Sequence, residues 1–358
     1  MDASTKCASN LTLINVTEQE TFNTTSSNVS GWKIPPVGPF ENTRVLLWRV
    51  IPPILITIGT IGNAMTIFVL LRQKKMTSTA VFLCALALSD TLILFSAPMP
   101  RWVLEIWGVD LWGISNLGCK TIPYLAYSSF QISSWLIVAV TLERTACVLF
   151  PHKVRLGCSP RNAGLIIAII VQAVFGINII ILVIFDVNGY KGICYPSTKG
   201  YQDLFDNVYR WIDITLRFGA PYPLLLIGNV IIVVELARSR SRRQRMNTSG
   251  QARDTRPVSL LLIGLSVAFL VTITPRSVCV VYSSYQREKS KALASVDPYT
   301  AWYDAQYIYF LCEVAILVRF FNATFNFAIY VFSGSKFRAE LRSVLCCKAT
   351  QGTRLFES

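Results

Sequence analysis

A stripe of polar side chains runs through an apolar segment near the C-terminal end of the chain. The segment FNATFNFAIY covers residues 321–330, and Asn322, Asn326 and Tyr330 recur in it every four residues. On a helix this spacing places all three on nearly one face, where amide and phenol groups can hydrogen-bond or hold a cation. A second polar group, Asp90, ends the apolar segment LALSD. A lone carboxylate in such a segment is costly unless polar partners surround it, so we expect the stripe to face Asp90.

Two further side chains can complete this polar cluster. Asn63 and Ser133 lie in other apolar segments, and their short polar groups can hydrogen-bond a carboxylate or an amide. We therefore expect Asp90, Asn63, Ser133, Asn322 and Asn326 to meet inside a helix bundle. In the alternative, polar side chains only hold neighbouring helices together, which would not require a carboxylate.

The composition indicates that the elements around this cluster cross a membrane. Of the 358 residues, 53% are hydrophobic and 15% are charged, and the mean hydropathy is +0.46. A bilayer core of about 30 Å requires about 20 apolar residues per helix. Segments of that length cover approximately residues 45–71, 79–105, 117–148, 163–185, 212–237, 258–282 and 306–332. The sequence predicts an all-α membrane protein, a seven-transmembrane helix bundle with a short amphipathic helix after the last span.

Basic residues are concentrated on one side of the predicted bundle. Of the 34 lysines and arginines, 19 lie at 72–75, 144–161, 238–256 and from 336 onward, with 5 acidic residues beside them. Because cytoplasmic loops favour basic residues, we expect a plasma-membrane protein with an extracellular N-terminus and a cytoplasmic C-terminus. This asymmetry also explains the net charge of +14 without nucleic acid. The first residues, MDASTKCASN, have no apolar run, so we expect no cleaved signal peptide.

The chain divides into three predicted parts. Residues 1–44 are rich in Ser, Thr and Asn and predict a disordered extracellular tail, glycosylated at the N-x-S/T sites Asn10, Asn15, Asn23 and Asn28. The alternative is that these sites arise by chance in a segment of this composition. Residues 45–333 form the predicted seven-transmembrane domain, and residues 334–358 form a cytoplasmic amphipathic helix and tail.

The segment after the last span has membrane signals of its own. Apolar residues recur at helical spacing from Phe337 to Leu345 beside basic residues, a pattern typical of a helix that lies on the inner membrane surface. Cys346 and Cys347 follow and are predicted palmitoylation sites, which would supply a second anchor. The alternative is two unmodified thiols in a reducing compartment.

Two of the 10 cysteines are placed to form a disulfide. Cys119 opens the third span and Cys194 lies in the loop DVNGYKGICYPSTKG, both on the oxidising side of the membrane. A bridge between them would fix that loop across the mouth of the bundle. Cys7, Cys279 and Cys312 can also lie on this side, and a second bridge among them stays open.

Taken in order, these motifs resemble those of the rhodopsin-like (class A) G-protein-coupled receptors. They are Gly62-Asn63, LALSD ending at Asp90, Cys119, Glu143-Arg144-Thr145, the stripe from Asn322 to Tyr330, and the SGSKFR that follows it. The likeness covers about residues 45–347. The FNATFNF form of the seventh span with SGSKFR is similar to invertebrate neuropeptide receptors of the FMRFamide and thyrotropin-releasing-hormone-like groups.

The resemblance implies roles for the residues that match the family's motifs. In the family, the cluster around Asp90 can hold a sodium ion or water, and the tyrosine matched by Tyr330 swings inward on activation. Glu143 would pair with Arg144 at rest, and release of the pair would free Arg144 to contact a heterotrimeric G protein. Further positions implied in activation and coupling are Pro151, Phe269, Pro275 and Asn326. The family implies arrestin and membrane lipid as further partners, no other cofactor and no enzymatic activity.

Four features depart from the family pattern. His152 follows Pro151 where a bulky apolar residue is usual, which puts the strength of G-protein coupling in doubt. The sixth span reads Thr-Ile-Thr-Pro, so Ile273 replaces the usual tryptophan, while Pro275 is still expected to kink the helix. Phe327 stands where a proline is usual, and the fourth span lacks a tryptophan. These departures predict a divergent receptor, and a non-signalling descendant is the alternative.

The outer parts of the spans indicate the class of ligand. Ala126 stands where amine receptors have an aspartate and Phe320 where visual pigments have a lysine, so the resemblance argues against amines and retinal. The predicted ligand-binding residues are Arg101, Trp102, Tyr127, Gln131, Arg276, Tyr282, Glu313 and Arg319.

Arg276 and Arg319 are the most informative of these residues. An arginine within a span usually faces a cavity or a partner, and its planar group suits carboxylates or the carbonyls of a peptide terminus. The alternative is that Glu313 or Asp304 neutralises each arginine internally.

Together these features predict a receptor that binds an extracellular neuropeptide and activates a heterotrimeric G protein. A small-molecule or odorant chemoreceptor on the same scaffold is the alternative. A transporter would predict internal repeats or broken helices at matching positions, and the sequence has neither.

Overall fold

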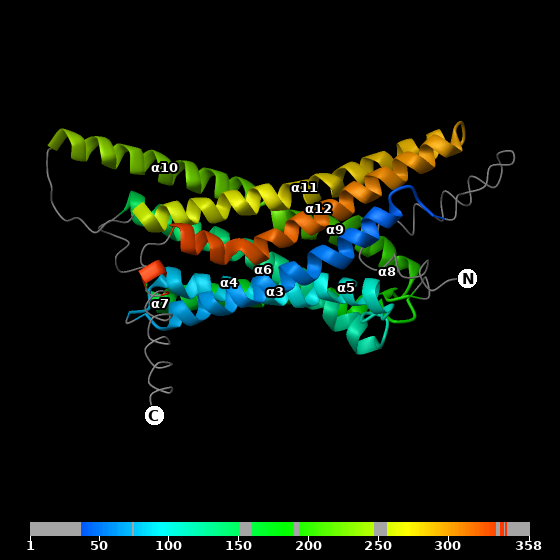
Figure 1. Ribbon diagram of the computed structural model, residues 1–358, viewed down its shortest axis with the longest axis horizontal. Helices are drawn as coiled ribbons and strands as arrows, with labels where there is room; N and C mark the ends of the chain where they lie inside the picture. Colours follow the sequence, from blue (N-terminus) through cyan, green and yellow to red (C-terminus); the bar gives the residue numbers. More distant parts are fainter. Residues whose placement is uncertain are drawn as a thin grey trace, which may run out of the picture.

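Seven helical spans form a bundle in the computed structural model of the chain (Figure 1). The structure describes residues 37–73, 75–150, 159–189, 193–246, 256–333, 337–339 and 341. Within these residues, the spans long and apolar enough to cross a membrane are Glu41–Leu71, Ser78–Trp107, Asn116–Leu149, Pro160–Ile184, Lys199–Ser239, Val258–Ser283 and Pro298–Phe332. Each contains or overlaps one predicted segment, so the predicted seven-transmembrane bundle is confirmed.

The spans follow one another in chain order, and two of them, the second and the fifth, are built from more than one element. The helices are α3 Glu41–Leu71, α4 Ser78–Ser96, α5 Pro98–Trp107, α6 Asn116–Leu149, α7 Pro160–Ile184, α8 Lys199–Leu204, η2 Phe205–Tyr209, α9 Arg210–Ile214, η3 Thr215–Gly219, α10 Pro221–Met246, α11 Arg256–Ala294 and α12 Pro298–Ser333. Between α7 and α8, the short strands β1 Phe185–Asp186 and β2 Tyr195–Pro196 pair in antiparallel orientation.

Side-chain caps fix where several helices begin. The hydroxyl groups of Thr77, Ser115 and Ser159 accept hydrogen bonds from backbone amides three residues further on, at 3.2, 3.1 and 3.2 Å respectively. Each cap satisfies an amide that the first helical turn leaves without a partner. The second span is interrupted at Ala97, because Pro98 cannot continue α4 but suits the first turn of α5.

The helices pack around a continuous apolar interior. The helix α6 packs against α4, α7, α10 and α11, while α12 packs against α3, α4 and α11. The apolar core between them includes Phe82, Leu136, Leu265 and Phe269, each 1% exposed or less. The outer faces of the helices carry many exposed large apolar side chains. A bundle that is apolar both inside and outside is suited to lipid as its solvent.

The fifth span contains two π-helical segments. The segments η2 and η3 interrupt the α-helical pattern on either side of the five-residue helix α9. A π turn holds more residues than an α turn, so it rotates the side chains that follow it relative to those before it. In this arrangement Tyr209, Arg210, Asp213 and Arg217 all face the bundle interior.

The sixth and seventh helices extend beyond their apolar segments. The predicted apolar segments 258–282 and 306–332 are separated by residues 283–305. In the structure α11 continues to Ala294 and α12 begins at Pro298, so most of this connection is helical. The extension is rich in good helix formers such as Lys, Ala and Glu. Asp297 caps α12, because Thr300 donates its backbone amide and its hydroxyl to the Asp297 carboxylate at 3.1 and 2.6 Å. The bond from the Thr300 hydroxyl, with those from backbone amides, lowers the pKa of this carboxyl group.

A disulfide joins Cys119, in the first turn of α6, to Cys194, with a Cα–Cα distance of 5.5 Å. The predicted bridge is therefore confirmed, and it ties the strand pair β1–β2 to this end of the bundle. Cys279 and Cys312 are free cysteines, so these two do not form a second bridge in the structure. Cys7 lies outside the described residues.

At the opposite end of the bundle, helical residues follow the last span. Phe337 is 6% exposed, and its ring lies 5.9 Å from that of Phe327 and 5.8 Å from that of Tyr330. Arg338 Nη1 donates to two backbone carbonyls near the end of α12, at 2.9 and 2.8 Å. These contacts anchor residues 337–339 to the bundle.

Several predictions concern residues that lie outside the described part of the chain, and they stay predictions. These residues are the glycosylation sites Asn10, Asn15, Asn23 and Asn28, the loop residues Pro151 and His152, and the palmitoylation sites Cys346 and Cys347.

The disulfide generates a stability prediction. C119S opens a link between residues separated by 75 positions, and loss of a native bridge typically costs about 2–5 kcal/mol. We expect the melting temperature of the detergent-solubilised protein to fall. The melting temperature of the double variant C119S/C194S should fall by the same amount. The melting temperature of C84S, which changes a free cysteine, should differ little from that of the wild type. An unchanged melting temperature for C119S would contradict the assigned role of the bridge.

Candidate ligand-binding site

A cavity lies beneath the disulfide, between α6, the fifth span, α11 and α12. Cys194 and Tyr195 of the strand pair line it, together with an aromatic wall formed by Tyr127, Phe205 and Tyr209. The ring centroids in this wall are 5.1 Å apart for Phe205 and Tyr209 and 5.6 Å apart for Tyr127 and Tyr209. Aromatic surface with a few polar groups is the usual lining of a small-ligand or peptide site.

One side of the cavity carries a connected polar network. Arg217 Nη2 donates to both carboxylate oxygens of Asp213 at 2.6 Å, and Gln131 Nε2 donates to Asp213 Oδ1 at 2.9 Å. Behind them, Asn178 Nδ2 donates to Gln131 Oε1 at 2.8 Å, and the Tyr209 hydroxyl donates to Asn178 Oδ1. Because a buried charge is tolerated when it is paired and hydrogen-bonded, this network neutralises Arg217 and fixes its position.

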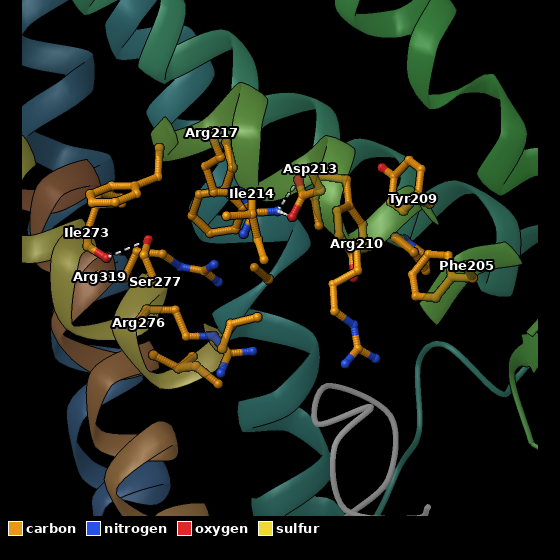
Figure 2. A pocket seen from close by; sticks show the side chains of 18 of the residues that line it. Phe205, Tyr209, Arg210, Asp213, Ile214, Arg217, Ile273, Arg276, Ser277 and Arg319 are labelled. Atoms are coloured by element: carbon orange, nitrogen blue, oxygen red, sulfur yellow. Dashed lines mark hydrogen bonds and ion pairs between the residues drawn. The ribbon is translucent and has the colours of Figure 1, made fainter. Parts of the chain in front are cut away.

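The other side carries two arginines that have no such partner. Figure 2 shows Arg276 of α11 and Arg319 of α12 reaching toward the space that Asp213 and Arg217 border from the fifth span. Arg319 is 6% exposed, and its guanidinium carbon lies 3.8 Å from the centre of the Phe130 ring. Arg319 Nε and Arg276 Nη1 are buried without a hydrogen-bond partner in the described part of the chain.

The internal partners that the sequence suggested for these arginines do not engage them. Glu313 instead accepts a hydrogen bond from Trp48 Nε1 at 2.6 Å. Within the described ranges, no ion pair links Arg276 or Arg319 to Glu313 or Asp304. The two guanidinium groups therefore remain available to a molecule in the cavity.

The structure separates the eight predicted ligand-binding residues into two groups. Tyr127, Arg276 and Arg319 line the cavity, and Gln131 supports it from behind through Asp213. The remaining four, Arg101, Trp102, Tyr282 and Glu313, do not line it.

The four displaced residues have other surroundings. Arg101 forms an ion pair with Glu105 at 2.9 Å, and Glu105 also pairs with Arg44 of α3 at 2.9 Å. Trp102 Nε1 donates to a backbone carbonyl of α3 at 3.2 Å. Tyr282 is 47% exposed on α11. Trp102, like Glu313 with its bond to Trp48, therefore joins neighbouring helices instead of facing a ligand. Arg101 contacts α3 through the ring of Trp48, whose centroid lies 5.5 Å from its guanidinium carbon.

Sequence reasoning missed the fifth-span residues that line the cavity, chiefly Arg210, Asp213 and Arg217. A signal was present, because acidic and basic residues stand four apart twice in this stretch, as Asp206 with Arg210 and Asp213 with Arg217. Such pairs are neighbours on a helix face, and charged residues within a span usually face the interior. Both pairs form in the structure. Arg210 Nη2 lies 2.5 Å from Asp206 Oδ1, and Arg217 Nη2 lies 2.6 Å from Asp213 Oδ2.

Deeper in the bundle, Asp90 is fully buried and hydrogen-bonded by two of the expected partners. Ser133 Oγ donates to Asp90 Oδ1 at 2.9 Å, and Asn326 Nδ2 donates to Asp90 Oδ2 at 2.6 Å. Asn63 instead donates to a backbone carbonyl of α12 at 3.1 Å, and no hydrogen bond between Asn322 and Asp90 is present among the described residues. The carboxylate thus joins α4, α6 and α12, and Asn63 joins α3 to α12.

These helices also carry oxygen atoms suited to a hard cation. The amide oxygens of Asn63, Asn322 and Asn326 are buried and have no hydrogen-bond partner in the described part of the chain. Carboxylate, hydroxyl and amide oxygens are the ligands that hard cations prefer, and ordered water also satisfies such atoms. The donor set around Asp90 therefore fits a small cation or water.

At the end of α6 remote from the disulfide, Glu143 and Arg144 are partly buried. The expected resting pair is not formed, since no ion pair joins their side chains in the described structure, and Glu143 Oε2 and Arg144 Nε are buried without hydrogen-bond partners. The Tyr330 hydroxyl is likewise buried without a hydrogen-bond partner. This end of the bundle therefore holds polar groups that can accept new contacts.

The departures in the sixth helix lie next to the cavity. Ile273 is 3% exposed and lines the cavity, one turn from the core residue Phe269. The helix α11 continues through Pro275, and the hydroxyl groups of Thr272 and Thr274 donate to carbonyls one turn back at 2.7 and 2.5 Å. An aliphatic side chain thus occupies the position between cavity and core.

Comparison with known proteins agrees with this arrangement. The family model for the 7 transmembrane receptor (rhodopsin family) matches residues 62–330. The chain is 24% identical to the thyrotropin-releasing hormone receptor of Mus musculus over 91% of this chain and 86% of the relative. It is 23% identical to the FMRFamide receptor of Drosophila melanogaster over 83% of this chain and 54% of that protein. It is 26% identical to the B1 bradykinin receptor of Macaca fascicularis over 83% of this chain and 82% of that protein.

The matched region extends from Gly62 in the first span to Tyr330 in the seventh and includes the bridge, the cavity and the Asp90 cluster. Both receptor groups that the sequence resembled are among these relatives. Members of this family are receptors and not enzymes. This chain belongs to the rhodopsin family of seven-transmembrane receptors, whose members couple to G proteins.

Proposed function

We propose that this receptor binds an extracellular neuropeptide in the cavity beneath the disulfide and responds by activating a heterotrimeric G protein. The observation that carries the proposal is the lining of the cavity, where an aromatic wall faces Arg276 and Arg319, which form no ion pair within the described part of the chain. Aromatic side chains suit apolar peptide residues, and guanidinium groups suit peptide carbonyls and carboxylates. The names of the relatives, which include receptors for thyrotropin-releasing hormone, FMRFamide and bradykinin, favour the same ligand class.

The N-terminus lies outside the cell in this proposal and the C-terminus lies in the cytoplasm. The disulfide end of the bundle then faces the oxidising side, and the basic loops face the cytoplasm. The polar N-terminal segment with its four N-x-S/T sites is glycosylated, and Cys346 and Cys347 carry palmitate that holds the tail at the lipid surface.

Peptide binding reaches the cytoplasmic end through α6 and α12. An agonist that contacts Arg319 changes the packing of α12 against Asp90 and moves Tyr330, which α12 carries, and these shifts expose Arg144 to the G protein. Arrestin binds the same end of the receptor. The absence of an ion pair between Glu143 and Arg144 within the described residues favours an Arg144 side chain that is free for this contact.

The Asp90 cluster holds a sodium ion in the resting receptor. Asp90, Ser133 and the amide oxygens of Asn322 and Asn326 supply the oxygen ligands, and the ion supplies the positive charge that the buried carboxylate lacks.

The ligand class can be tested with the receptor expressed beside a promiscuous G protein and a calcium reporter. Peptide extracts are applied before and after protease digestion, and we expect a response that digestion abolishes. A response that survives digestion would contradict the peptide assignment and indicate a small-molecule chemoreceptor on the same scaffold. Cells that lack the receptor provide the control.

Arg319→Ala should weaken agonist potency by about 10- to 100-fold, because one charged hydrogen-bonding partner of the ligand is lost. The measurement is the dose–response curve of an active peptide fraction at matched surface expression. Arg49→Ala is the control, because Arg49 is exposed and donates to a carbonyl of α5 away from the cavity. Unchanged potency for Arg319→Ala would contradict a ligand contact at this residue.

The sodium site can be tested without an agonist. A cation that binds only the folded receptor raises its stability, so the melting temperature of the wild type should be higher in sodium than in choline at equal ionic strength. Asp90→Asn should abolish this difference. Equal melting temperatures of the wild type in both salts would argue for water alone in the cluster.

A further inference from the structure

The carboxylates beside the cavity are already occupied by arginines of the fifth span. Asp213 receives Arg217 Nη2 on both of its oxygens at 2.6 Å and Gln131 at 2.9 Å. Asp206 receives Arg210 at 2.5 Å. Among the residues that line the cavity, Asp213 is the one acidic side chain. A cationic group of a ligand would therefore meet no free carboxylate there.

Arg276 and Arg319 add positive charge that these carboxylates do not balance. Arg319 is nine-tenths buried, and its guanidinium group lies over the rings of Phe130 and Phe320, with centroid distances of 3.8 and 5.4 Å. An aromatic face attracts a cation, but it is no substitute for the oxygen acceptors that guanidinium N–H groups require. Arg319 Nε and Arg276 Nη1 have no acceptor within the part of the chain that the structure describes. Among the described residues, this side of the cavity lacks an anion.

The two arginines converge from different helices, so a single group can contact both. Arg276 comes from α11 and Arg319 from α12, and both line the same cavity. Buried charges are tolerated when they are paired and hydrogen-bonded. A carboxylate presents two oxygens in the planar geometry that a guanidinium group recognises.

We propose that the ligand carries an anionic group, a carboxylate, which binds between Arg276 and Arg319. The inference rests on the proposed peptide function and narrows it to peptides that have a free C-terminal carboxylate or an acidic side chain at the end that enters the cavity. Peptides whose inserted end is only cationic or neutral are excluded. The aromatic wall receives the neighbouring apolar residue of the peptide.

The first test needs no ligand and measures the cost of the two unpaired charges. The melting temperature of the unliganded, detergent-solubilised receptor is compared for wild type, R276Q/R319Q and R217Q. Glutamine keeps hydrogen-bonding capacity and removes the charge. We expect R276Q/R319Q to melt at or above the wild-type temperature and R217Q to melt below it, because R217Q leaves Asp213 without its ion-pair partner. A melting temperature of R276Q/R319Q below that of the wild type would mean that the arginines are paired within the receptor and would overturn the proposal.

The second test identifies the ligand group with four pools of short synthetic peptides of matched composition. One pool has a free C-terminal carboxylate, one is amidated with a single Asp or Glu, one is amidated and neutral, and one is amidated with a single Lys or Arg. We expect calcium responses only to the first two, and whichever of them acts shows the source of the carboxylate. R276Q/R319Q should lose about 10- to 100-fold in potency toward the active pool.

The outcomes separate this inference from the proposed function. Activation of the wild type by the neutral or basic pool, as strong as by the carboxylate pools, would overturn the anionic assignment and leave the receptor a peptide receptor. Silence of all four pools at verified surface expression would overturn both. Activation by a carboxylate pool with unchanged potency in R276Q/R319Q would place the carboxylate elsewhere and overturn the assignment to these two arginines.

Discussion

The constraint on which the structure depends is that every polar group inside the bundle must find its partner within the protein, because the surrounding lipid offers none. Asp90 meets this requirement with Ser133 and Asn326, which come from two other helices. Asp213 meets it with Gln131 and Arg217. Each carboxylate thereby fixes the relative position of its helices, while the apolar core contributes packing without direction. Some described groups that lack such a partner, among them Arg276 Nη1, Arg319 Nε and the Asn322 and Asn326 amide oxygens, lie where another molecule or an ion can complete them.

Two helices carry both the cavity and the buried cluster, and this arrangement connects them physically. On α6, Phe130 borders the cavity and Ser133 contacts Asp90 three residues later, about 4.5 Å along the axis. On α12, Arg319 borders the cavity and Asn326 contacts Asp90 seven residues later, about 10.5 Å along the axis. A helix shifts largely as a rigid unit over such distances. Under the proposed function, a ligand that displaces Arg319 would therefore change the environment of Asp90 without an intervening flexible segment.

The sequence was sufficient to predict the spans, because the length of an apolar segment is a local property. It was also sufficient to predict that Asp90 meets Ser133 and Asn326, because helical spacing sets the face on which each residue lies. It was insufficient to predict the surroundings of Arg101 and Glu313, which do not line the cavity. A buried charged residue looks the same in sequence whether it faces a ligand or joins two helices, and only the fold distinguishes these cases. The helical extension of α11 to Ala294 was hidden for a related reason, since its polar residues carry no apolar period.

The part of the cavity lining that comes from the fifth span was harder to predict. Its charges carry a signal in their spacing, but which of them face the cavity depends on the two π-helical segments, which have no clear signature in the sequence. Each α-helical residue turns the chain by roughly 100°, and a π turn accommodates an additional residue. Removing one residue from η2 or η3 would carry Asp213 or the side chains beside it away from the cavity while leaving hydropathy and charge almost unchanged. Related receptors that differ by a single insertion or deletion in this span would thus present different surfaces to their ligands on the same scaffold. Specificity in this part of the molecule can evolve through helix register as well as through substitution.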